Sequence, residues 1–249
     1  MLANKLSLGS VQWGSSYGIS NINGQTEANE VSKILNEARL KGIKLIDTAT
    51  SYGTAESVLG NYDLNFFSIV TKTPSFEKSI ITKLDTEKLI SKFKQSLKKL
   101  NIKSCYGLLL HHKKEIFKDG GENLIFALNE LKSKGLVKKI GLSIYDSTKI
   151  NEVVEKLKPD IIQLPLNVFD QRVIQDGTLK DLKSNNIEIH ARSIFLQGLL
   201  LMPYEKIPIF FKKWSHKFKE WERICLEKKM NFVEVALNFV INQKDVDYC

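Results

Sequence analysis

Short apolar runs alternate with amphipathic helical segments along nearly the whole chain. Seven runs have the length and bounding residues of strands, at residues 6–11, 43–46, 66–71, 106–110, 137–143, 161–164 and 187–193. Helical patterns occupy most of the intervals, at residues 26–40, 56–60, 86–100, 122–133, 147–157 and 175–183. Strands that alternate with helices form βα units with a parallel sheet. No GxGxxG follows any strand, so the pattern favours a closed barrel over an open doubly wound sheet.

The length of the chain suits one barrel domain over residues 1–249. It has 249 residues, of which 43% are hydrophobic, and an eight-stranded α/β barrel takes about 250 residues. There is no apolar run of bilayer length and no N-terminal signal pattern. We therefore expect a soluble cytoplasmic protein with no membrane partner, whose oligomeric state the sequence leaves open.

The formal net charge is +9, which raises the alternative of a nucleic-acid partner. The lysines, however, are spread along every helix and alternate with acids, and lysine outnumbers arginine. Arginine is the better reader of phosphates and bases. Solvated helix faces are the favoured interpretation, with no nucleic-acid partner. The three cysteines and four histidines show no metal-ligand spacing, so no metal site is predicted.

Polar residues that can carry chemistry follow three of the predicted strands. Asp47 ends the strand at 43–46, and Tyr52 lies in the loop before the next helix. Lys72 follows the next strand, and His111 follows the one after it. A phenol has a pKa near 10, so it needs a neighbouring cation to donate protons readily at neutral pH. Lys72 supplies that cation if the strand ends meet.

These residues, read together, resemble the aldo-keto reductases. The resemblance rests on Asp47-Thr48-Ala49, Tyr52-Gly53 with Glu56, Thr71-Lys72, and the apolar run Leu108-Leu109-Leu110 before His111, and it extends over residues 6–247. It implies a (β/α)₈ TIM barrel that uses NADPH to reduce an aldehyde or ketone, with a small-molecule carbonyl substrate.

The resemblance also assigns a role to each of the four residues. Tyr52 is expected to donate the proton, Lys72 to lie beside its hydroxyl and lower its pKa, and Asp47 to pair with Lys72. His111 is expected to hydrogen-bond the carbonyl. Its neighbour His112 is the alternative, but side chains alternate along a strand, so only one of the two faces the pocket.

Further positions resemble the family's cofactor and substrate residues. Ser143 and Gln163 match the residues that bind the nicotinamide carboxamide, with Asn167 in support, although Ile144 stands where an asparagine is usual. Arg192 and Ser193 replace an aromatic-serine pair, and Leu196, Gln197 and Gly198 resemble the pyrophosphate loop. Trp13 is a candidate wall of the substrate pocket, with ordinary loop packing as its alternative.

The end of the chain departs from the family pattern. After residue 248 the family continues into the eighth strand and a segment that holds the cofactor's adenosine end. We therefore expect the eighth strand and the C-terminal cofactor segment to be truncated or replaced. A non-catalytic nicotinamide-binding or regulatory protein on the same fold is the alternative function.

Overall fold

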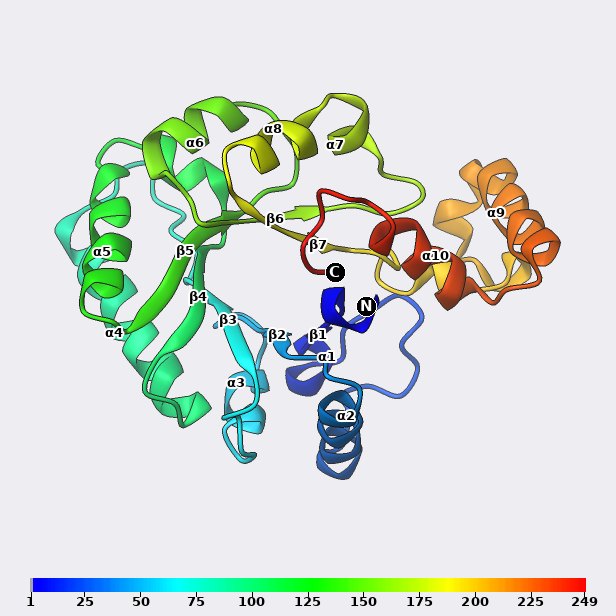
Figure 1. Cartoon of the computed structure of the whole chain (residues 1–249), viewed down its shortest axis with the longest axis horizontal. Coiled ribbons are helices and arrows are strands. Elements are labelled where there is room, and N and C mark those ends of the chain that lie inside the picture. Colours follow the sequence, from blue (N-terminus) through cyan, green and yellow to red (C-terminus); the bar gives the residue numbers. More distant parts are fainter. Residues whose placement is uncertain (1) are drawn as a thin grey trace.

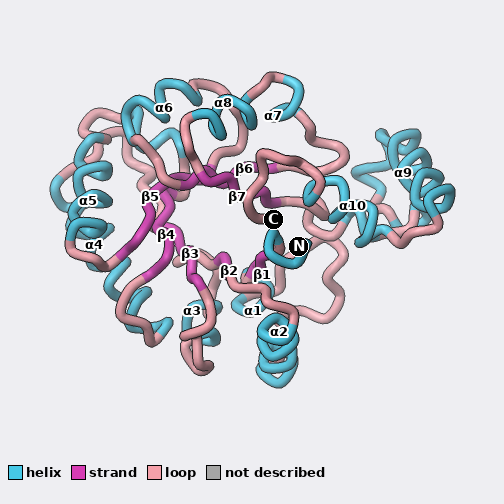
Figure 2. The backbone as a smooth tube through the Cα atoms, viewed as in Figure 1, coloured by secondary structure: helices cyan, strands magenta, loops and turns pink. Residues whose placement is uncertain are grey.

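The computed structural model describes residues 2–249 and contains a curved parallel sheet whose strands follow one another in sequence order (Figures 1 and 2). The seven strands are β1 (Ser7–Gly9), β2 (Leu45–Asp47), β3 (Ser68–Lys72), β4 (Cys105–Leu110), β5 (Val137–Ser143), β6 (Ile161–Pro165) and β7 (Glu188–Arg192). Each strand pairs in parallel with the next. All strand C-termini therefore lie at one edge of the sheet.

Helices connect the strands and cover the outer, convex side of the sheet (Figure 1). The α-helices are α1 (Val11–Gly14), α2 (Ala28–Leu40), α3 (Ala55–Leu59), α4 (Lys83–Leu100), α5 (Glu122–Ser133), α6 (Ile150–Leu157), α7 (Arg172–Gln175), α8 (Thr178–Ser184), α9 (Ser215–Lys228) and α10 (Phe232–Ile241). Short 3₁₀ turns are η1 (Leu2–Lys5), η2 (Lys113–Phe117), η3 (Leu199–Leu201), η4 (Tyr204–Lys206) and η5 (Ile209–Trp214). α9 stands at the side of the molecule, beyond α10 (Figure 1).

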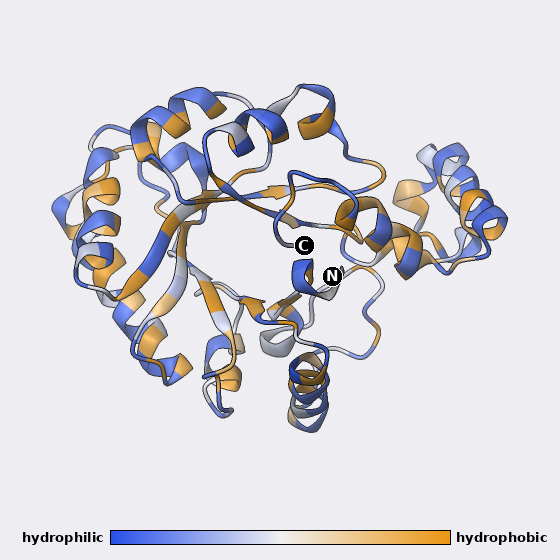
Figure 3. Ribbon diagram, in the orientation of Figure 1, coloured by the Kyte–Doolittle hydropathy of each residue, from blue (hydrophilic) through white to orange (hydrophobic). Residues whose placement is uncertain are grey.

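The helices form because each has an apolar face and signals that define its ends. In α4, Leu89, Phe93 and Leu97 are spaced by four residues and are buried against the sheet. A capping box between Thr82 and Asp85 begins this helix. Hydrophobic residues are concentrated in most of the strands and on parts of the covering helices, and hydrophilic residues are frequent on the helices (Figure 3). The main core thus lies between the sheet and its helices.

One predicted helix and one predicted strand have different bounds in the structure. Of the helix predicted at 175–183, Gln175 is the last residue of α7 and residues 178–183 belong to α8, and Gly177 lies between the two helices with a φ of +80°. Such a φ costs little only for glycine, because no Cβ clashes there. The first predicted strand likewise ends early, at Gly9, and the chain turns directly into α1.

The last three described residues lie between β7 and β1. The amide nitrogens of Asp247 and Tyr248 donate to the Ile189 carbonyl over 3.0 and 3.1 Å, and Ala191 donates to the Tyr248 carbonyl over 2.8 Å. On the other side, Cys249 donates to the Lys5 carbonyl and Ser7 donates to the Cys249 carbonyl, each over 2.8 Å. The backbone of residues 247–249 therefore bridges the two edge strands, at the place where the resemblance led us to expect the eighth strand to be truncated or replaced.

The space enclosed by the sheet has an apolar middle and a polar floor. Leu45, Val70, Leu109 and Ile161 form the apolar layer. At the N-terminal end of β7, Glu188 accepts hydrogen bonds from the Tyr106 hydroxyl and from the ammonium of Lys139, and lies 2.7 Å from Nε2 of His190. This polar cluster lies at the end of the sheet opposite to the strand C-termini.

Candidate active site

The C-terminal ends of β2, β3 and β4 bring the four predicted catalytic residues to one cleft. Asp47 and Lys72 are the last residues of β2 and β3, and His111 directly follows β4. Tyr52 reaches the same place from the loop between β2 and α3. All four line a cleft of about 1130 Å³. The position is the one that barrel enzymes use for their active sites.

Lys72 is the centre of the hydrogen-bond network. Its side chain is 1% exposed, and Nζ lies 2.6 and 2.7 Å from the two carboxylate oxygens of Asp47. The same nitrogen donates to the Thr48 carbonyl over 3.0 Å and to the Tyr52 hydroxyl oxygen over 3.3 Å. An ammonium can only donate. The Tyr52 oxygen is therefore the acceptor in this contact, and the phenolic proton must point elsewhere.

Two glycines set the position of Tyr52. A Cβ on Gly14 would lie 1.9 Å from the Tyr52 carbonyl oxygen, and one on Gly53 would lie 2.1 Å from the Gly14 carbonyl oxygen. Gly53 also has a φ of +56°. The loop can pack this closely against α1 only because both positions lack a side chain. The Tyr52-Gly53 pair in the sequence thus has a steric reason.

Burial raises the pKa of Tyr52 above its ordinary value, and the Asp47 carboxylate raises it further. This direction is opposite to the prediction that Lys72 lowers it. Burial also lowers the pKa of Lys72, although the Asp47 carboxylate opposes that effect. Because Lys72 shares its charge with Asp47, its net field on the phenol is weak. Tyr52 consequently keeps its proton at neutral pH.

The two histidines take different positions. His111 lines the cleft, and burial together with the Lys72 charge lowers its pKa to about 4, so the ring is neutral at pH 7. His112 stacks on His111 with ring centroids 4.8 Å apart. Its Nε2 lies 3.0 Å from the Ser75 hydroxyl, outside the cleft lining. His111 is thus the one positioned to meet a substrate.

Six of the predicted cofactor residues line the same cleft, namely Ser143, Gln163, Arg192, Ser193, Gln197 and Gly198. Nε2 of Gln163 donates to Asp47 over 2.7 Å, while its Oε1 is buried without a hydrogen-bond partner among residues 2–249. An unmet buried acceptor is costly, so it marks a place where a ligand amide can donate. The Gln163 carbonyl and the Ser143 hydroxyl therefore fit a nicotinamide carboxamide.

Three predicted site residues lie elsewhere. The Asn167 side chain accepts from the amides of Phe169 and Asp170 in its own loop and donates to the Ser193 carbonyl in the loop after β7. It supports the loop at Ser193 and does not line the cleft. Leu196 packs against apolar neighbours, and Trp13 is buried in the core with 4% exposure. Trp13 therefore has the packing role that was the alternative interpretation of this residue.

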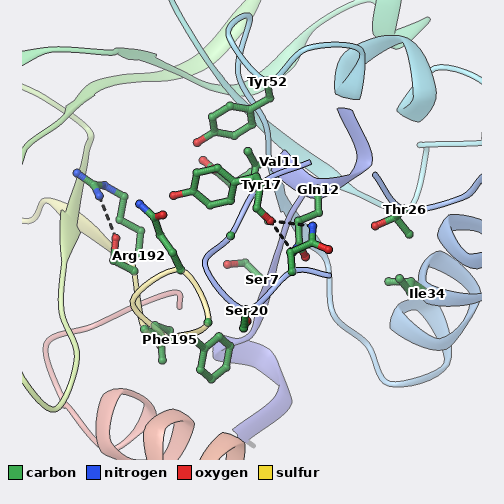
Figure 4. Close-up of a pocket in the computed structure, with 18 of the residues that line it drawn as sticks. Ser7, Val11, Gln12, Tyr17, Ser20, Thr26, Ile34, Tyr52, Arg192 and Phe195 are labelled. Carbon is green, nitrogen blue, oxygen red and sulfur yellow. Dashed lines mark hydrogen bonds between the residues drawn. The ribbon is translucent and has the colours of Figure 1, made fainter. Parts of the chain in front are cut away.

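Two tyrosines of the cleft were not predicted from the sequence. Tyr17 lies in the segment after α1, and Tyr145 follows β5 by two residues. The only available signal for Tyr145 was its distance from the strand end at Ser143. The segment that carries Tyr17 crosses to the opposite loop, where Ile19 donates to the Gln197 carbonyl over 2.7 Å. Figure 4 shows Tyr17 beside Tyr52 in the cleft.

Among residues 2–249, no group of histidine, cysteine or acidic side chains is placed to hold a metal ion. Within the same range, none of the helices has the length and apolarity to cross a bilayer.

Comparison with known proteins agrees with this architecture. The profile of the aldo/keto reductase family matches residues 5–248. The NADH-specific methylglyoxal reductase of Escherichia coli K12 is 24% identical, over 84% of this chain and 74% of that protein. The uncharacterized oxidoreductase YqkF of Bacillus subtilis 168 is 28% identical, over 90% of this chain and 74% of that protein.

Solved structures show the same fold. The aldo-keto reductase AKR11C1 from Bacillus halodurans, in its holo form, superposes with a TM-score of 0.74 at 18% identity and covers 98% of this chain and 80% of its own. The glycerol dehydrogenase AKR11B4 from Gluconobacter oxydans gives 0.71 at 21% identity, with coverages of 98% and 81%. The family profile covers nearly the whole length of the chain, and the parallel sheet agrees with the fold of these structures. The chain is therefore a member of the aldo/keto reductase family.

Proposed function

We propose that this protein reduces an aldehyde or ketone to an alcohol with NADPH, and that Tyr52 is the proton donor. The observation that carries the proposal is the direction of the Lys72 contact. Because Lys72 donates to the Tyr52 oxygen, the phenolic hydrogen is free to point to a carbonyl oxygen in the cleft.

The other residues support that donor. The raised pKa of Tyr52 keeps the phenol protonated until negative charge develops on the substrate oxygen. The phenolate that remains after proton transfer accepts the hydrogen bond from Lys72, and this direct contact stabilises it. Asp47 holds that ammonium in place through both carboxylate oxygens. A neutral His111 can hydrogen-bond the carbonyl, but it has no imidazolium proton to transfer as an acid.

Ser143, Gln163, Ser193, Gln197 and Gly198 are the residues proposed to hold the cofactor. The buried, unpartnered Oε1 of Gln163 supports this assignment for the carboxamide end. When bound, the reduced nicotinamide supplies the hydride that the carbonyl carbon accepts. The name of the E. coli relative makes NADH the competing choice, and the basic surface of this chain favours the additional phosphate of NADPH.

The test compares the wild-type chain with Tyr52→Phe. Both proteins are titrated with NADPH and with NADH by tryptophan fluorescence, and both are assayed for loss of nicotinamide absorbance with aldehydes. We expect the variant to lose about 10²-fold or more in kcat while its NADPH dissociation constant changes little. A Phe variant that still turned over would refute the role of Tyr52. Cofactor binding by the wild type without turnover on any carbonyl would point to the non-catalytic alternative.

A further inference from the structure

Arg192, the last residue of β7, holds a guanidinium at the edge of the cleft. Its Nη1 donates to the Ser193 hydroxyl over 3.0 Å, and its Nη2 donates to the Ile144 carbonyl over 2.9 Å. The guanidinium carbon lies 4.4 Å from the centroid of the Tyr145 ring. These contacts fix the group without using all of its N–H donors, so part of the fork is available to a ligand.

Arg192 forms no ion pair with any carboxylate of residues 2–249. The cation nearest the reacting phenol, Lys72, is already neutralised by Asp47. Asp170, which lies close enough for the Arg192 charge to lower its pKa, is bound on both oxygens by Arg172 at 2.7 Å. A half-buried guanidinium with no anion is a preformed site for a carboxylate or a phosphate.

Besides Asp47, which is paired with Lys72, the acids that line the cleft lie at its other side. Glu27 and Glu30 line it near the start of α2. Figure 4 shows Thr26 and Ile34, which flank this stretch in the sequence, on the side away from Arg192. The cleft therefore has one basic and one acidic side, which would orient a ligand that carries a negative charge at one end.

Arg192 is also placed near the proposed chemistry. In Figure 4 the rings of Tyr52 and Tyr17 lie one above the other, and both hydroxyl groups are directed to the side that carries Arg192. The Arg192 charge acts to lower the pKa of Tyr52 and of Tyr17, against the larger effect of burial. A molecule whose carbonyl oxygen meets Tyr52 can thus extend toward Arg192.

We propose that Arg192 binds the carboxylate or phosphate of an anionic carbonyl substrate while its carbonyl group meets Tyr52. This inference rests on the proposed reductase function and names the substrate class of that site. The guanidinium carbon lies over the Tyr145 ring, and the N–H groups that bind neither Ser193 nor Ile144 are left for the anion. A phosphate of the dinucleotide has the same chemistry, so the experiment must separate the two sources.

The experiment measures a ratio of catalytic efficiencies for matched substrates. The pairs are 4-oxobutanoate with its methyl ester, and glyceraldehyde 3-phosphate with glyceraldehyde. Taking kcat/KM as a ratio cancels any loss that affects both members of a pair. For at least one pair we expect the wild type to favour the anion by at least about tenfold. Arg192→Gln should bring that ratio to within about threefold of unity, and Arg192→Lys should lie between.

Lys138→Gln is the matched control. It removes the same unit of charge from an exposed residue at the other end of β5, so its ratio should equal that of the wild type. Equal ratios for Arg192→Gln and the wild type would overturn the proposal. The proposal would also be overturned if Lys138→Gln lowered the ratio as much as Arg192→Gln does, because the effect would then come from the overall charge of the protein.

Binding measurements separate the remaining cases. If Arg192→Gln keeps the preference for anions but binds NADPH and NADH about tenfold more weakly, the dinucleotide phosphate is the partner and the proposal is wrong. If no carbonyl is turned over, the proposed function fails by itself, and calorimetry of the cofactor-saturated protein with succinate decides the site. Binding of succinate by the wild type and not by Arg192→Gln would support the anion site; no binding to either would refute it.

Discussion

Removing the charge of Lys72 tests whether the Asp47–Lys72 pair is the buried centre of this site. In Lys72→Met the Asp47 carboxylate loses a partner at 2.6 and 2.7 Å, while its side chain is only 18% exposed. Breaking one side of a buried pair costs about 3–5 kcal/mol. Since Asp47 keeps some contact with solvent and retains Gln163 as a donor, we expect about 3 kcal/mol.

The assay is urea unfolding at pH 7, followed by tryptophan fluorescence, for Lys72→Met, Asp47→Asn and the double variant. Because the double variant leaves no uncompensated charge, its cost should fall short of the sum of the single costs by about 2 kcal/mol. Lys134→Met is the control, since it breaks an exposed pair with Glu130 on α5 and should cost under about 0.5 kcal/mol. Additive costs, or a Lys72→Met cost no larger than the control, would refute the reasoning.

Three further predictions concern stability. Burial and the Lys72 charge lower the pKa of His111 to about 4. As the pH drops from about 6.5, the unfolded chain therefore takes up a proton at this residue before the folded chain does, and the stability should fall. The urea midpoints at pH 7 and pH 5.5 should differ less for His111→Gln than for the wild type. Burial would raise the pKa of Glu188, but hydrogen bonds from His190, Lys139 and Tyr106 lower it to about 2. The wild type should therefore lose stability as the pH falls from about 4.5 toward 2, and Glu188→Gln should show a shallower decline in that range. Deleting Asp247–Cys249 removes the backbone hydrogen bonds to β7 and β1 and should lower the free energy of unfolding by at least about 2 kcal/mol. The shortened chain should also self-associate, which size-exclusion chromatography would show. An unchanged thermal melt and a monomer would show that the bridge contributes little.

Most of the fold could be predicted from local sequence patterns. The apolar runs and amphipathic segments alternate so regularly that the parallel sheet and the place of Asp47 and Lys72 at its edge followed from them. The break at Gly177 was not visible, because helical periodicity continues through a break of one or two residues. The early end of β1 at Gly9 was not visible either, because the alternating strand pattern continues to Val11. The bridge by Asp247–Cys249 has no sequence signal of its own, because a segment of three residues is too short to show periodicity.

The features of the site that could not be predicted from the sequence depend on three-dimensional packing. Tyr17 and Tyr145 lie in loops, whose paths depend on contacts such as that of Ile19 with Gln197. The direction of the Tyr52 pKa shift depends on burial and on how far Asp47 neutralises Lys72, and neither quantity has a sequence signal. Trp13 and Asn167 carry side chains suited to a site but are used for packing and for loop structure.

The most direct test of the account is one turnover with a reduced cofactor deuterated at the transferred position of the nicotinamide. The chain is incubated with this NADPH or NADH and an aldehyde, and the alcohol is analysed by mass spectrometry and NMR. Deuterium on the carbinol carbon in the wild type, with no labelled alcohol from Tyr52→Phe, is the predicted result. An unlabelled alcohol, or equal labelled product from both proteins, would contradict hydride transfer with Tyr52 as the acid.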